Sequence, residues 1–144
     1  MKKSDEKIKK ISLAKVERSY ILPFDFEFTG IFNEEHSNFP KNILSEISLE
    51  NGEELICSTF INDQIWTVLT SRRILSKEGI TKDIHSIKQI KKWNFGDFKG
   101  FSKQPFTKGF LFFDDNKVVP VFIETGRASM IMINGIMTLN QIVK

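Results

Sequence analysis

The sequence predicts a mainly β fold with added α-helix (α+β), and three stretches carry this prediction. Residues 64–77, QIWTVLTSRRILSK, hold two runs of strand-forming residues that meet at a polar corner, Thr70–Ser71. In residues 20–32, phenylalanines at positions 24, 26 and 28 alternate with polar residues, which is the period of a half-buried strand. Residues 126–144 repeat an apolar stripe every three or four positions, as one face of a helix does.

Two helices and one strand are expected before residue 50. Residues 1–18 show a weak helical period among lysines, which indicates either a short amphipathic helix or a frayed tail. Tyr20–Phe32 follows as a strand, and Pro23 places its start at an edge or turn. A second helix begins near Asn38 or Ser37, either of which can cap it, and Pro40 suits its first turn. Its apolar positions continue to Leu49, and Asn51–Gly52 ends it.

Strand signals then dominate, separated by turn dipeptides such as Asn62–Asp63 and Glu78–Gly79. The expected strands are Glu53–Phe60, Gln64–Thr70, Arg72–Lys77, Ile84–Trp93, Gly109–Phe113 and Val118–Glu124. The last two form a hairpin around the turn at residues 114–117, and residues 94–108 form a long loop.

The C-terminal segment has two readings. The stripe predicts a helix over Gly126–Lys144 whose buried face comprises Ala128, Ile131, Gly135, Leu139 and Ile142. Gly135 would cost this helix about 1 kcal/mol relative to Ala, but it allows a close approach to a sheet. The alternative is a hairpin that turns at Asn134–Gly135. We favour the helix because residues 130–133 do not alternate.

The corner Thr70–Ser71–Arg72–Arg73 between two strands resembles the "strand, Thr-x-x-Arg, strand" pattern of bacterial pleckstrin-homology-like (PH-like) domains. The later strands and the helix after Glu124–Thr125–Gly126 follow in the order of that family. The resemblance covers about residues 50–144. It implies a seven-stranded antiparallel barrel or two-sheet sandwich capped by a C-terminal helix, which serves as a scaffold for binding lipid headgroups or proteins. Residues 1–50 would form an N-terminal extension that packs on the domain at residues 51–144.

Charge is segregated along the chain, although the net charge is only +3. Residues 19–70 carry one lysine against nine acids, whereas residues 71–108 carry ten basic and three acidic groups. These two blocks can attract each other or polarise the surface. The acidic block would oppose a phosphate backbone, which argues against nucleic acid as a partner.

The single cysteine, Cys57, lies in the apolar run 55–60 and is expected to be a small buried hydrophobe in a reducing compartment. The basic N-terminus is not followed by an apolar run typical of a secretory signal, and no stretch reaches the ~18 apolar residues of a membrane span. We therefore expect a cytoplasmic protein without a transmembrane segment.

Residues that carry catalysis or bind metals are sparse. His36 and His85 are isolated, and no sequence signature surrounds Cys57. His36 beside Glu34–Glu35 lacks the further ligand that a metal site needs, and no glycine-rich phosphate loop is present. The sequence therefore predicts neither an enzyme nor a metal or cofactor site.

The best functional candidate is the stretch 91–108, where lysines interleave with aromatic rings. The candidate binding residues are Lys91, Lys92, Trp93, Phe95, Phe98, Lys99, Phe101, Lys103 and Lys108. Exposed, they would suit an anionic membrane or a phosphorylated ligand. Alternatively, the rings fill the core and the lysines keep the loop solvated.

We expect a non-catalytic binding module that recognises a protein partner. An inhibitor or immunity-type role is one form of this, in which the acidic face would mask a basic active site of a toxic enzyme. The alternative is peripheral binding of an anionic lipid or phosphorylated ligand through residues 91–108.

Overall fold

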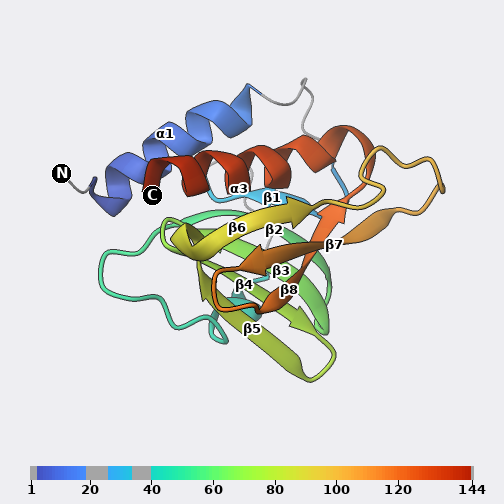
Figure 1. Ribbon diagram of the computed structural model, residues 1–144, viewed down its shortest axis with the longest axis horizontal. Helices are drawn as coiled ribbons and strands as arrows, with labels where there is room; N and C mark the ends of the chain where they lie inside the picture. The colour runs from blue at the N-terminus through green and yellow to red at the C-terminus, as the bar shows by residue number, and fades with distance from the viewer. Residues whose placement is uncertain (1–2, 19–25, 34–39, 144) are drawn as a thin grey trace.

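The computed structural model describes residues 3–18, 26–33 and 40–143 as a mixed α and β protein (Figure 1). The helices are α1 (Asp5–Glu17), α2 (Lys41–Leu44) and α3 (Ser129–Val143), with short 3₁₀ turns at Ile87–Gln89 and Gly126–Ala128. The strands are β1 (Thr29–Ile31), β2 (Leu55–Asn62), β3 (Ile65–Thr70), β4 (Arg73–Glu78), β5 (Thr81–Ser86), β6 (Ile90–Asn94), β7 (Phe106–Phe113) and β8 (Val118–Glu124). No helix in these ranges is long and apolar enough to cross a membrane.

The described strands form two antiparallel sheets, in the orders β1-β2-β3-β4-β5 and β6-β7-β8. Within each sheet, every strand pairs with the next strand in the chain, and the chain passes from one sheet to the other between β5 and β6. The predicted α+β class with antiparallel strands is therefore confirmed. A closed barrel is not formed by the strands that the structure describes.

Both faces of β3 and of the middle of β4 are buried, whereas β5 at the edge of the sheet is exposed or partly exposed. Leu69 and Ile74 face the main core beneath the helices and the second sheet. Trp66, Val68 and Leu75 face the opposite way, into a smaller core that includes Ile43 and Ile47 from the α2 region. Side chains of successive residues in a strand point to opposite faces, so a strand covered on both sides has few polar positions.

Helix α3 confirms the predicted C-terminal helix, and the hairpin at Asn134–Gly135 is wrong. Ala128, Ile131, Gly135 and Leu139 of the predicted stripe are buried, and Ile142 is partly buried. A Cβ atom at Gly135 would lie 2.8 Å from Leu69 Cδ2 and 3.3 Å from Cys57 Sγ. The glycine thus lets the helix approach the sheet, as expected.

Helix α1 lies beside α3, and both cover one side of the sheets (Figure 1). Its N-terminus is capped by the Ser4 hydroxyl, which accepts a hydrogen bond from the Lys7 N–H at 3.2 Å. Ile8 and Val16 are buried against the main core. The weak apolar period of residues 1–18 therefore did predict a helix.

The segment between α1 and β2 is less regular than predicted. Helix α2 is a single turn with Pro40 at its N-cap and ends at Leu44, so Leu49 lies outside it and is 42% exposed. Ser37 and Asn38, the predicted caps, lie outside the described residues, as does Phe24 of the predicted strand. Strand β1 is only three residues long and begins after Phe28.

The predicted strand Ile84–Trp93 is two strands in two different sheets. The chain leaves β5 at Ser86, makes a 3₁₀ turn at Ile87–Gln89 and enters β6 in the three-stranded sheet. The Asn140 side chain of α3 donates hydrogen bonds to the carbonyls of Ile87 (3.0 Å) and Ile90 (3.3 Å). These bonds satisfy buried carbonyls where the chain changes sheet. The predicted loop 94–108 is also shorter, because β7 begins at Phe106.

Polar side chains join the two sheets. The Glu124 carboxylate, at the end of β8, accepts hydrogen bonds from the backbone N–H groups of Phe28 (2.8 Å) and Thr29 (2.9 Å) beside β1. The Thr67 hydroxyl of β3 accepts a hydrogen bond from the Phe122 N–H at 2.9 Å. These contacts fix the three-stranded sheet on the rest of the molecule.

Candidate binding surface

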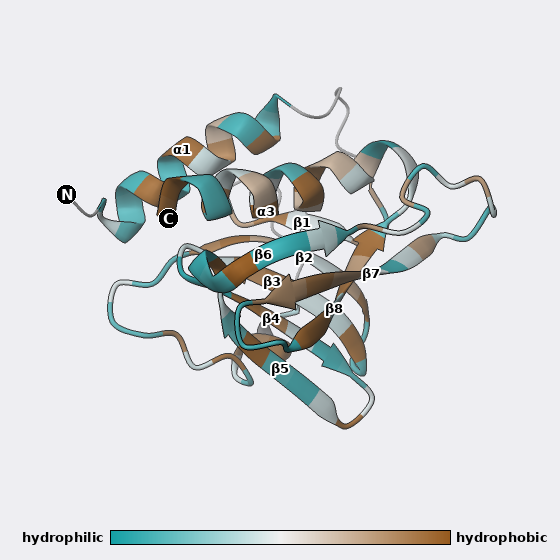
Figure 2. Cartoon of the chain, viewed as in Figure 1, coloured by the Kyte–Doolittle hydropathy of each residue, from teal (hydrophilic) through white to brown (hydrophobic). Residues whose placement is uncertain are grey.

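The outward face of the three-stranded sheet carries apolar side chains. In β7, Gly109, Leu111 and Phe113 are buried toward the core, and the residues between them point away from it. Figure 2 shows β7 and β8 as largely hydrophobic beside a hydrophilic β6. We define the β7–β8 face by its outward residues: Lys92, Lys108, Phe110, Phe112, Val118 and Pro120.

Two of these side chains are substantially exposed for apolar groups: Phe110 at 37% and Val118 at 51%. They are close neighbours, because Phe112 pairs with Val118 and Phe110 pairs with Pro120 across the β7–β8 register. Directly opposite side chains in a sheet lie within about 5.5 Å of each other at their Cβ atoms. The face is thus one continuous apolar patch.

Lysines lie over the rings of this patch. Lys92 Nζ is 4.9 Å from the centroid of Phe112, and Lys108 Nζ is 5.5 Å from the centroid of Phe110. Lys108 also forms an ion pair of 2.8 Å with Glu78 at the end of β4. Cation–π pairs at exposed sites contribute about 0.5–1 kcal/mol. A surface of rings and ammonium groups can accept a partner that offers apolar and acidic groups together.

The predicted site residues differ in exposure. Lys91, Lys92, Lys99, Lys103 and Lys108 are all exposed. Among the rings, Phe95 is only 8% exposed, Phe98 packs against the main core, and Trp93, stacked on Phe95 at 6.0 Å, is 36% exposed. Phe101 differs, since it is 83% exposed.

Phe101 is exposed on an ordered turn. The Asp97 carboxylate accepts hydrogen bonds from the Ser102 hydroxyl (2.5 Å) and from the N–H groups of Ser102 (2.7 Å) and Phe101 (3.0 Å). These bonds, that from the Ser102 side chain first, lower the pKa of Asp97. The Gly126 N–H also donates to the Phe98 carbonyl at 2.8 Å. The turn therefore presents Phe101 between Lys99 and Lys103.

Four apolar residues of this face were not predicted to lie at the surface: Phe110, Phe112, Val118 and Pro120. The signal was present, because residues 110–113 are four apolar residues in a row within a hairpin. Such a run indicates that both faces of a strand are apolar. Only the structure shows that one of these faces is open.

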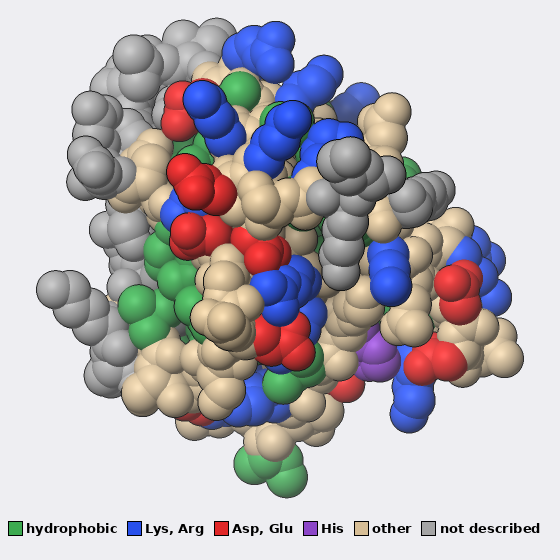
Figure 3. Space-filling model, turned by 90° about the vertical axis from the view of Figure 1, so that its left-hand side faces the viewer, with side chains coloured by type: hydrophobic (Ala, Val, Ile, Leu, Met, Phe, Trp, Pro, Cys, Tyr) green, Lys and Arg blue, Asp and Glu red, His purple; other side chains and the backbone are tan. Residues whose placement is uncertain are grey.

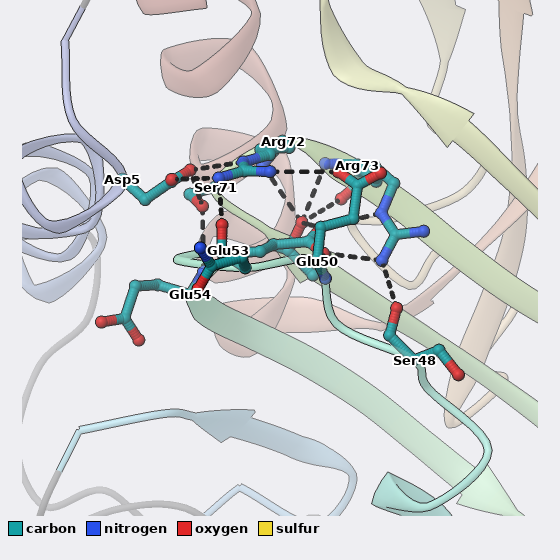
Figure 4. Close-up of polar contacts among 10 residues, drawn as sticks. Asp5, Ser48, Glu50, Glu53, Glu54, Ser71, Arg72 and Arg73 are labelled. Carbon is teal, nitrogen blue, oxygen red and sulfur yellow. Dashed lines mark hydrogen bonds and ion pairs between the residues drawn. The ribbon is translucent and has the colours of Figure 1, made fainter.

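The paired arginines lie in a polar network at the corner between β3 and β4 (Figure 4). Arg73 pairs with Glu53, an acid of residues 19–70, at 2.6 Å. Arg72 lies in a bend before β4, where it bonds to Asp5 at 2.6 Å and to Glu50 at 3.2 Å. Hydrogen bonds that the guanidinium groups donate to the carboxylates raise the pKa of both arginines, that of Arg72 chiefly through Asp5 and that of Arg73 chiefly through Glu53.

The acidic and basic blocks attract each other within the molecule. Besides the arginine pairs, Lys77 contacts Glu46 at 3.1 Å, and Lys82 donates a hydrogen bond to the Glu46 carbonyl at 3.0 Å. Most of these basic side chains come from β4 and β5 and meet residues 46–53. The two blocks of opposite charge therefore form ion pairs with each other within the folded chain. These ion pairs leave fewer acids of residues 19–70 free to contact a partner.

The two potential catalytic groups that the structure describes, Cys57 and His85, have different surroundings. Cys57 is fully buried, as predicted, and burial raises the pKa of its thiol to about 12, which keeps it protonated. The His85 ring lies 4.6 Å from the Phe113 ring, and His36 is outside the described residues. No three His, Cys, Asp or Glu residues in the described ranges are grouped so as to hold a metal. Comparison of the chain with protein-family models, curated proteins and solved structures gives no match to any of them.

Proposed function

We propose that this protein is a PH-like, non-catalytic binding module that recognises a protein partner through the β7–β8 face. The strand order supports the PH-like part of the proposal. Strands β2–β5 form a four-stranded meander, β6–β8 form a three-stranded one, and a C-terminal helix follows. In this reading, β1 is an added edge strand contributed by the residues before 50.

The observation that carries the binding proposal is the continuous patch formed by Phe110, Phe112, Val118 and Pro120. Single exposed apolar residues are common on protein surfaces, but a contiguous apolar patch rimmed by polar groups is typical of an interaction site. Aromatic rings are also enriched in interface cores. Lys92 and Lys108 provide the polar rim.

The charges favour this face over the acidic one. Glu46, Glu50 and Glu53 are bonded to basic residues of the same chain. An immunity-type role that masks a basic active site with these acids would have to break those ion pairs. An inhibitor that acts through the β7–β8 face would instead bind a target with acidic and apolar groups.

The experiment is photo-crosslinking from the β7–β8 face in cells, followed by affinity measurement with each identified partner. We expect Phe110→Ser with Val118→Ser to weaken binding at least tenfold, because buried aromatic anchors dominate interface energies. Leu49→Ser with Met137→Ser is the matched control, since Leu49 and Met137 are 42% and 41% exposed elsewhere. A partner that binds both double variants equally well would contradict the proposal.

Phe101 favours a second candidate function, binding to an anionic membrane. It is 83% exposed between Lys99 and Lys103, and a ring that inserts beside two lysines is a common form of peripheral anchor. Each lysine contributes about 1 kcal/mol near an anionic surface, so the ring is needed as well. We would compare flotation on anionic and neutral liposomes at about 20 and 150 mM salt. Binding to anionic liposomes that Phe101→Ser abolishes would support this function, and absence of binding at both salts would exclude it.

A further inference from the structure

A further site lies on a different side of the molecule, where the N-terminal end of α1 and the C-terminal end of α3 meet the β3–β4 corner. Here a cleft of about 920 Å³ opens between the first turn of α1, residues 71–73, the end of β5 and the last residues of α3. Figure 3 looks onto this side and shows acidic and basic side chains gathered at its centre. The volume falls within the range of about 300–1,000 Å³ that is typical of small-molecule sites.

The described residues that line the cleft carry more basic than acidic groups. The two acids among them, Asp5 and Glu50, are both bonded to Arg72. Asp5 is fully engaged, since one oxygen accepts from the Ser71 hydroxyl (2.7 Å) and Arg72 Nε (2.9 Å), and the other accepts from Arg72 Nη2 (2.6 Å). Lys3 and Lys88 also line the cleft, and neither forms an ion pair within the described residues. Their charges are the ones that remain for a ligand.

Neutral and titratable donors stand beside these lysines. His85 and Ser86 line the cleft next to Lys88, at the point where β5 ends. A hydroxyl, an imidazole and two ammonium groups are donors that suit a carboxylate or phosphate. The N-terminal end of α1, which also faces the cleft, adds a favourable dipole for an anion.

The cleft also has an apolar lining. Ile8, Ile142 and Val143 come from the two helices; Ile8 is buried, whereas Ile142 and Val143 are partly exposed. Ile84 of β5 also borders the cleft, but it pairs with Leu75 and therefore points to the other face of the sheet. An aliphatic chain laid along Ile142 and Val143 would remove them from water.

We propose that this cleft binds a small amphipathic anion, in which a carboxylate or phosphate contacts Lys3 and Lys88 and a short aliphatic body covers Ile142 and Val143. A carboxylate and a phosphate both carry negative oxygens that can accept hydrogen bonds from these lysines. The site is independent of the β7–β8 face, so either can fail without the other.

Titration of the full chain with octanoate and octyl phosphate tests the proposal, monitored by calorimetry and by amide chemical shifts. Octanol, octylammonium and inorganic phosphate are the comparison ligands. We expect saturable binding of at least one octyl anion, with shifts at residues 84–88 and 142–143. The comparison of octanoate with octyl phosphate identifies the preferred head group. Each comparison ligand should bind at least tenfold more weakly, because it lacks the anion or the chain.

Matched variants locate the site. Lys3→Gln with Lys88→Gln should weaken binding about tenfold, as expected for loss of charge-assisted contacts. Lys10→Gln with Lys117→Gln, which removes two exposed lysines elsewhere, should leave it unchanged. Val143→Ser should also weaken binding, whereas Met137→Ser, at an exposed position of α3, should not, and thermal unfolding checks that all variants fold. Failure of both anions to bind, equal binding of octanol, or insensitivity to Lys3→Gln with Lys88→Gln would overturn the proposal.

Discussion

Glu53 keeps a charged carboxylate in a fully buried position at the corner before β2. Its side chain has no exposed surface, but its oxygens accept hydrogen bonds from Arg73 Nε (2.8 Å), the Thr70 hydroxyl (2.5 Å) and the Glu50 N–H (2.8 Å). Burial alone would raise the pKa of Glu53, and the bonds from Arg73, Thr70 and Glu50 outweigh it and lower the pKa. The Thr-x-x-Arg pattern of the sequence is therefore one half of a buried ion-pair site.

Replacing this carboxylate should destabilise the protein strongly. Glu53→Gln leaves the Arg73 guanidinium, which is only 17% exposed, without its counter-charge, and we expect a loss of about 3 kcal/mol in the free energy of unfolding at pH 7. The adjacent Glu54→Gln is the matched control. Glu54 is 44% exposed and lies 3.9 Å from Lys9, so its loss should cost less than about 1 kcal/mol. Urea unfolding of both variants measures the difference, and equal costs would contradict the role given to Glu53.

The Glu53 carboxylate should also make the stability of the protein depend on pH in the acidic range. Because folding lowers the pKa of Glu53 from its ordinary 4.5, its contribution is fully present above that pH and is lost as the pH falls through the folded-state pKa. The gap in stability between wild type and Glu53→Gln should therefore narrow as the pH is lowered from about 6 to about 3. Thermal unfolding across this range checks it. A gap that stays constant would mean that the charge of Glu53 is unimportant.

At the scale of elements, the β6–β7 contact should tolerate no side chain at Gly109. A Cβ atom there would lie 2.7 Å from the Asn94 carbonyl oxygen and 3.0 Å from Phe95 Cα, both backbone atoms. Gly109→Ala should therefore push the strands apart and cost roughly 2–3 kcal/mol, the upper range for overpacking. Gly135→Ala is the comparison: it meets the movable ends of Leu69 and Cys57, and the helix gains up to about 1 kcal/mol from Ala. Urea unfolding in which Gly135→Ala costs more would contradict this ranking.

The elements that the sequence predicted well are those with local causes. The stripe of α3 and the polar corner at residues 70–71 depend on spacing and turn chemistry within a few residues. The break between β5 and β6 does not. Ile84, Ile87 and Ile90 suggest one continuous apolar strand, and the turn that separates them is held by Asn140, about fifty residues later in the chain. A contact of that kind leaves no signal in the local pattern.

The candidate site follows the same rule. The positions of its lysines at the surface were predictable, because ammonium groups are rarely buried. The exposure of each aromatic ring was not predictable. Phe95 is buried and Phe101 is exposed, although both lie in the same run of Phe, Lys and Gly. The turn closed by Asp97 makes the difference, since its hydrogen bonds direct residues 99–103 away from the core. Predicting the β7–β8 face would have required the pairing register between β7 and β8, which the structure supplies.

At the scale of the whole molecule, α1 contacts the rest of the protein at both of its ends. Asp5 bonds to Ser71 and Arg72 of the β3–β4 corner, and Val16 at the other end is fully buried beside α3 near Gly135. These contacts join α1, which precedes residue 51, to the stretch that we propose to be PH-like. They predict that the N-terminal helix and the sheets unfold together as one cooperative unit.

Val16→Ala tests this cooperativity. Removal of two buried methyl groups should cost about 2 kcal/mol, which lowers the unfolding temperature of a domain of this size by roughly 6 °C. The transition should stay single, and near-UV signals from Trp66 in the sheet should shift by the same amount as the helical far-UV signal. Lys10→Ala, on the exposed side of α1, should leave the unfolding temperature within about 1 °C of wild type. If Val16→Ala instead produced an early helical transition while the sheet signal kept its unfolding temperature, α1 would be a separately folding extension. Its contacts with the β3–β4 corner would then add nothing to the stability of the sheets.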